Sequence, residues 1–199
     1  ASFRRLGARV VALEPQPDCS AIIQDLFHDD PDVTLVRAAC GRETGQATLH
    51  VNTANATVAT LSEAFVDAAG GAKGWEDEIW DIDCTVPVTT LDALIAEHGE
   101  PAFAKIDVEG HEAGVLAGLS RPLKTVSFEF TTIQRDVAME CLGQLARLGS
   151  YRFNVALGES QTMEFQDWVS GKAMSTHIES LPHEANSGDV YARLARKGD

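Results

Sequence analysis

Apolar residues along this chain gather in short runs, separated by stretches rich in Gly, Pro, Asp and Asn. Runs of four to eight apolar residues bounded by turn residues are typical of strands buried on both faces, and alternation is typical of half-buried strands. On these grounds the sequence predicts strands at residues 9–13, 33–39, 45–51, 79–88, 103–108, 125–131, 151–157 and 190–195.

Between these strands the apolar residues recur every three or four positions, which is the spacing of one helix face. The last turn of a helix is expected at residues 2–6, with Gly7 as its cap. The inward stripe of the next helix is expected to consist of Ile22, Ile23, Leu26 and Phe27. Further helices are predicted after Thr90, at residues 111–119, and along a stripe formed by Val137, Cys141, Leu145 and Leu148. Strands that alternate with helices favour an α/β fold with a parallel or mostly parallel sheet.

In two segments the apolar residues show no regular spacing. Residues 53–78 are rich in Ala, Gly and Thr, and we expect a long loop or lid with one helical turn near residues 61–68. Residues 159–187 are expected to be irregular and polar around Phe165 and Trp168. An unstructured segment of such length in a compact domain is typically functional or mobile.

Composition and charge narrow the function classes. The chain has 199 residues, 44% of them hydrophobic, and a formal net charge of −14. We therefore expect one domain over residues 1–199, and the negative charge argues against a general attraction to nucleic acid or anionic membranes. The four cysteines are widely spaced, which suggests neither a zinc ribbon nor a disulfide framework and favours the reducing cytoplasm. These residues contain neither a signal-peptide pattern nor an apolar run of membrane length.

Carboxylates end three of the predicted strands: Glu14, Asp107 and Glu129. We expect them to share a site, because the carboxyl ends of strands in an open α/β sheet form the ligand-binding edge. An acidic residue after the second strand of a Rossmann-like unit accepts hydrogen bonds from the ribose hydroxyls of an adenosine cofactor, and Glu14 has that position. Taken alone, Glu14 is also consistent with a solvated strand end, and Asp107 with a helix cap.

The segment from Ala104 to Glu112 is the densest in ionisable groups. Gly110 is expected to provide a turn at which the backbone approaches a ligand closely. His111 is a candidate general base because the pKa of histidine lies near neutrality. Glu112 suits the helix dipole without needing a further role. An alternative is an oxygen-rich Mg²⁺ or Ca²⁺ site built from Asp107, Glu109, His111 and Glu129, although the site is expected to hold no metal.

The residues Thr89–Ile95, Phe103–Glu112 and Val115–Gly118 resemble the FkbM-type methyltransferase family, and Val11–Pro15 resembles its second strand. The resemblance implies a class I Rossmann-like fold, with a doubly wound, mostly parallel sheet and an antiparallel C-terminal strand. It also implies S-adenosylmethionine as the cofactor and O-methylation of a hydroxyl on a glycan, a lipid-linked sugar or a secondary metabolite. The residues expected to contact the cofactor are Glu14, Pro15, Ala39, Cys40 and Asp107. Those expected to act in catalysis are Asp107, His111 and Glu129.

Two other functions remain open at this stage. Glu14 suits the ribose of NAD equally well, as in a Rossmann-like oxidoreductase. The glycine-rich first loop of the class I fold is absent, which favours a non-catalytic remnant that binds a partner. Because neighbouring strands would lose their ladder partners without the first strand, we expect the chain to be N-terminally incomplete. An antiparallel strand pair at residues 151–157 and 190–195 would favour the methyltransferase over the oxidoreductase.

Overall fold

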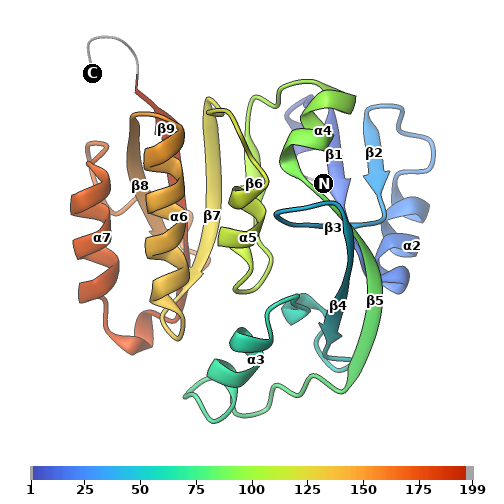
Figure 1. Cartoon of the computed structure of the whole chain (residues 1–199), viewed down its shortest axis with the longest axis horizontal. Coiled ribbons are helices and arrows are strands. Elements are labelled where there is room, and N and C mark those ends of the chain that lie inside the picture. The colour runs from blue at the N-terminus through green and yellow to red at the C-terminus, as the bar shows by residue number, and fades with distance from the viewer. Residues whose placement is uncertain (1, 196–199) are drawn as a thin grey trace.

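The computed structural model describes residues 2–195 and has a mixed α/β fold (Figure 1). Its strands are β1 (Val10–Leu13), β2 (Val33–Val36), β3 (Ala39–Cys40), β4 (Gly45–Val51), β5 (Ile82–Thr89), β6 (Ala104–Ile106), β7 (Thr125–Thr131), β8 (Tyr151–Leu157) and β9 (Ser187–Leu194). Its helices are α1 (Ser2–Arg5), α2 (Pro17–Leu26), α3 (Glu63–Ala69), α4 (Leu91–His98), α5 (Glu112–Ala117), α6 (Arg135–Leu148) and α7 (Gly171–Ser180), with 3₁₀ turns η1 (Ala56–Val58) and η2 (His183–Ala185).

The strands of the described residues form three separate hydrogen-bonded sheets. β1 pairs with β2, the second sheet has the order β3-β5-β4, and the third has the order β6-β7-β9-β8. Within residues 2–195 no strand joins β1 to β6, so the single continuous sheet expected from the sequence is divided. Three strand pairs are parallel (β1–β2, β3–β5, β6–β7) and three are antiparallel (β4–β5, β7–β9, β8–β9), so the first sheet is parallel and the other two are mixed, which agrees with the expected α/β class.

The late strand β9 lies between β7 and β8 and runs antiparallel to both, so the antiparallel C-terminal strand that the resemblance implies is confirmed. Its register places Val190 opposite Phe128, and Asp189 opposite Glu129. Because side chains alternate between the two faces of a strand, these pairs lie on opposite faces of the sheet. One face is apolar and the other carries charge.

Helices cover the apolar face of this sheet. α5, α6 and α7 lie along it in Figure 1, and the main hydrophobic core forms between them and the sheet. Phe128, Val190, Cys141 and Leu145 are all fully buried there. The stripe predicted for α6 is therefore confirmed at its centre.

The link between β4 and β5 carries its own small core. Phe65 of α3 is fully buried, and its ring meets Trp75 and Trp80 edge-on at centroid distances of 5.2 and 6.0 Å. Such edge-to-face pairs add about 0.5–1.5 kcal/mol each beyond area burial. The helical turn expected near residues 61–68 is thus confirmed as α3, and we call residues 52–81 the lid segment.

Two sequence-based expectations were wrong. Ile22 and Leu26 are 59% and 70% exposed, because the side of α2 that packs against β2 carries the buried Ser20 and the half-buried Ile23 and Phe27. Residues 171–180, expected to be irregular, form helix α7.

No helix in the described part of the chain is long and apolar enough to cross a membrane.

Candidate functional site

A cavity of about 500 Å³ opens where the ends of β1, β3 and β6 approach one another. Volumes of 300–1,000 Å³ are usual for sites that bind small molecules or cofactors. Its lining includes every residue expected to contact a cofactor, namely Glu14, Pro15, Ala39, Cys40 and Asp107. His111 and Glu109 line it as well, whereas Glu129 is not part of the lining.

Glu14 follows β1 directly and lies at the rim of the cavity. One of its carboxylate oxygens accepts a hydrogen bond of 2.8 Å from the backbone N–H of Gln16. Partial burial raises the pKa of Glu14, and the bond from Gln16 partly offsets this rise. Within the described residues the carboxylate accepts hydrogen bonds from Gln16 alone, so it retains lone pairs for a ligand hydroxyl.

Beside Glu14, the cavity wall is apolar and chemically quiet. Ala39 and Cys40 form β3 and are buried. Burial raises the pKa of the Cys40 thiol to about 12, so at neutral pH it remains a thiol and is no nucleophile. Pro15 stiffens the turn that follows Glu14. Such a wall suits an apolar ring rather than a charged group.

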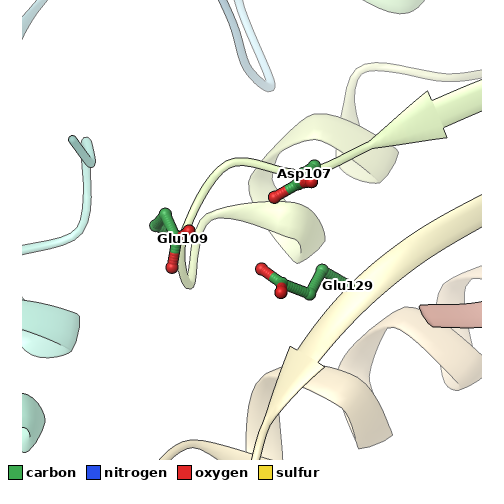
Figure 2. A group of neighbouring side chains, drawn as sticks. All are labelled: Asp107, Glu109 and Glu129. Carbon is green, nitrogen blue, oxygen red and sulfur yellow. The ribbon is translucent and has the colours of Figure 1, made fainter. Parts of the chain in front are cut away.

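Three carboxylates lie close together beside the cavity (Figure 2), and two of them, Asp107 and Glu109, line it. Asp107 follows β6, Glu109 lies on the turn before α5, and Glu129 comes from β7. Figure 2 shows the Glu129 side chain pointing toward the loop that carries the other two. One carboxylate oxygen from each residue lies within 4.8 Å of the others. We call Asp107, Glu109 and Glu129 the acidic cluster.

Lys105 balances part of this negative charge. Its Nζ lies 3.0 Å from Asp107 Oδ2 and 2.9 Å from Oδ1 of Asp189 in β9. Burial opposes the charge on Lys105, but the bonds to Asp189 and Asp107 outweigh burial and raise its pKa. Asp107 is thereby held as an ion-paired carboxylate.

The other two members of the acidic cluster hold protons tightly. Burial, followed by the charges of Asp107 and Glu112, raises the pKa of Glu109 to about 8. Burial, followed by the charges of Asp107 and Glu109, also raises the pKa of Glu129. Its Oε2 is buried without a hydrogen-bond partner among the described residues. Near neutral pH these groups are therefore suited to donate a hydrogen bond, and a cation that bound to them would displace their protons.

Glu112 has a structural part in the site. It is only 2% exposed, and its Oε1 accepts hydrogen bonds from the backbone N–H groups of Val108 and Gly110, at 3.1 and 3.2 Å. The carboxylate thus closes the loop that carries Glu109. Burial raises the pKa of Glu112 to about 7 despite these bonds.

We expect the free energy of unfolding to fall as the pH rises from 5 to 8. Glu112 keeps its proton up to about pH 7 in the folded chain, whereas in the unfolded chain it loses it near pH 4.5, so the folded state binds more protons in this window. The Glu112→Gln variant, whose amide oxygen can accept the same bonds, should show a shallower fall, by up to about 3 kcal/mol. Urea unfolding at four pH values measures the free energy of unfolding of both proteins. If it falls with pH as steeply in Glu112→Gln as in the native protein, the prediction is contradicted.

His111 is the N-cap residue of α5, and its side chain makes no capping bond. Its ring lies against Gly114 one turn later, where any side chain would collide with it. Burial lowers the pKa of His111, so the imidazole is neutral at physiological pH. A neutral imidazole at a cavity wall can accept a proton.

The acidic cluster offers oxygen atoms of the kind that Mg²⁺ and Ca²⁺ prefer. The structure brings together three of the four residues considered for such a site, namely Asp107, Glu109 and Glu129. His111 is not part of that group. An organic ammonium group is an equally suitable charge partner for these oxygens.

Comparison with known proteins and families bears on the identity of the domain. A comparison with curated proteins finds no match. The family model of the methyltransferase FkbM domain, in contrast, matches residues 1–170, which is most of the chain. The resemblance found in the sequence is thus confirmed, and the chain belongs to the FkbM methyltransferase domain family.

Proposed function

We propose that this protein transfers a methyl group from S-adenosylmethionine to a hydroxyl of a glycan, a lipid-linked sugar or a secondary metabolite. The observation that carries the proposal is the common cavity of Glu14 and Asp107, which lie far apart in the sequence and follow different strands. The antiparallel β9 between β7 and β8 favours this function over an oxidoreductase. The proposal includes the doubly wound arrangement that is typical of the family. It also includes a cytoplasmic location for the protein, which the free cysteines favour.

The residues around the cavity fit the cofactor by their chemistry. Glu14 retains an acceptor oxygen for the ribose hydroxyls, and Ala39 and Cys40 provide an apolar wall for the adenine ring. Asp107 offers a carboxylate to the amino group at the methionine end, with Lys105 limiting its excess charge. When bound, S-adenosylmethionine supplies a methyl group activated by a sulfonium.

The acceptor hydroxyl must lose a proton as it is methylated. Among the groups at the cavity, His111 is the most suitable proton acceptor because burial keeps its imidazole neutral. Glu129 has a raised pKa, so near neutral pH it serves better as a hydrogen-bond donor that orients the acceptor. Positioning of the acceptor accounts for the rest of the catalysis in this proposal.

Calorimetry with S-adenosylhomocysteine tests the cofactor assignment. We expect Glu14→Ala in the full-length protein to weaken binding by more than ~1 kcal/mol, because a hydrogen bond to a charged group contributes about 1.5–3 kcal/mol. Glu97→Ala, at a carboxylate that is 76% exposed on α4, is the matched control and should bind as the native protein does. Binding of NAD in place of S-adenosylhomocysteine would instead identify an oxidoreductase, and an unchanged affinity in Glu14→Ala would remove Glu14 from the site.

A further inference from the structure

Thr60 of the lid segment is bonded directly to the loop that carries the acidic cluster. Its Oγ1 donates a hydrogen bond of 2.6 Å to the backbone carbonyl of Glu109. The same hydroxyl accepts a bond of 2.9 Å from the backbone N–H of Ser62, and the residue is 1% exposed. Because the hydroxyl is buried and donates in one direction while accepting from another, its orientation is fixed.

The backbone of Thr60 is anchored as well. Its N–H donates to the carbonyl of His50 at 3.0 Å, and its carbonyl accepts from the N–H of His50 at 2.8 Å. His50 belongs to β4, which pairs with β5 along its whole length. Thr60 therefore ties the loop to a sheet rather than to a free strand end.

Glu109 needs such an attachment because of its backbone conformation. Its φ is +52°, in the left-handed region that residues other than glycine rarely adopt. Glu112 fixes the N–H groups on both sides of Glu109, those of Val108 and Gly110. Thr60 fixes the carbonyl of Glu109 itself, so three backbone groups around this one side chain are held.

We infer that Thr60 is a positioning residue: its hydroxyl holds the Glu109 backbone so that the Glu109 carboxylate faces Asp107, Glu129 and the cavity. Thr60 acts through Glu109 and does not line the cavity itself. The hold of Thr60 on Glu109 does not depend on the proposed function. Only its consequence does, namely that the orientation of Glu109 serves methyl transfer.

Variants of Thr60 test this consequence in the full-length protein. Thr60→Val keeps the shape but removes the donor, and we expect kcat to fall by about 10–10²-fold, because a small misplacement of a group that lines the site has effects of this size. The dissociation constant of S-adenosylhomocysteine should remain within about two-fold, since Glu14 and the apolar wall are untouched. Thr60→Ser retains the hydroxyl and should restore most of kcat.

Thr53→Val is the matched control. Thr53 also belongs to the lid segment and also donates a side-chain bond, of 2.7 Å, but to Asp81 at an exposed position. It should keep the native kcat. A native kcat in Thr60→Val, a Thr60→Ser variant as slow as Thr60→Val, or a Thr53→Val variant that is equally slow would each overturn the inference.

A readout without turnover separates this inference from the proposed function. The ¹⁵N shift of Gly110 reports on the hydrogen bond to the preceding carbonyl, and labelling only the 16 glycines makes its signal assignable. We expect the signal to move in Thr60→Val and to return in Thr60→Ser. If it does so while the native protein methylates no acceptor, the positioning of Glu109 stands and the proposed function fails; an unmoved signal overturns the positioning.

Discussion

His111→Asn is expected to lower kcat for methyl transfer by about 10²–10⁴-fold, the usual contribution of a positioned general base. Asparagine retains a polar side chain of smaller size but has no group that accepts a proton near neutral pH. Because His111 is assigned to the acceptor and not to the cofactor, the affinity for S-adenosylhomocysteine should be unchanged. Steady-state kinetics with an acceptor that the native protein methylates, together with calorimetry, measure both quantities.

The matched control for this change is His28→Asn. His28 is 65% exposed, outside the cavity, and should tolerate the substitution without loss of kcat. Should His111→Asn retain near-native turnover, the proton acceptor is another group, with Glu129 the next to replace. Native turnover in both His111 and Glu129 variants would mean that the enzyme works by positioning alone.

Gly110→Ala should be the most damaging single change in the loop of the acidic cluster. Gly110 has a φ of +83°, and an added Cβ would lie 2.7 and 2.8 Å from atoms of Phe65 and even closer to the side chain of Gln134. Phe65 is fully buried in the core of the lid segment and cannot retreat. We expect a loss of unfolding free energy and a displacement of Glu109.

Gly71→Ala separates the two causes of this loss. Gly71, in the lid segment, has a similar φ of +80°, but an added Cβ would meet nothing within 4 Å. It should therefore show the cost of a positive φ without the collision, and Gly110→Ala should be less stable than Gly71→Ala by about 1–3 kcal/mol, the usual cost of overpacking. Urea unfolding of the two variants measures the difference. Equal losses would mean that the lid segment yields to the added methyl group.

The strands that the sequence predicted best are those with a clear apolar pattern. β4, β7 and β8 have the predicted bounds because alternation or an unbroken apolar run defines each of them. Helix α7 was missed because only Met174 and Ile178, one turn apart, carry its apolar face. A pair of apolar residues among Gly, Ser and Thr does not establish a helical period.

The prediction that Ile22 and Leu26 of α2 face inward was wrong for a different reason. Ile22 and Leu26 have the spacing of a buried stripe, but in the described part of the chain α2 packs mainly against β2. Periodicity shows which residues share a face of a helix. It does not show whether another element lies against that face.

The candidate site was predictable as far as strand ends determine it. The rule that ligands bind at the carboxyl ends of strands predicted a common site for Glu14 and Asp107. Both residues line the same cavity. No comparable signal points to Asp189 or Thr60, because their places depend on the register of β9 and on the path of the lid segment. Lys105 had a weak signal, since it lies two residues before Asp107 and so on the same side of the strand.

The position of β9 has a consequence for the order of folding. β8 meets the four-stranded sheet only through β9, which follows it in the sequence, so during synthesis β8 must wait for a strand that leaves the ribosome later. The ion pair of Lys105 with Asp189 joins residues 84 positions apart and forms at the same late step. Non-local pairings of this kind slow folding. A nascent chain halted before β9 should therefore remain sensitive to proteases between β7 and β8. In that chain Lys105 should lack its ion pair with Asp189, one of the two that hold it beside the acidic cluster.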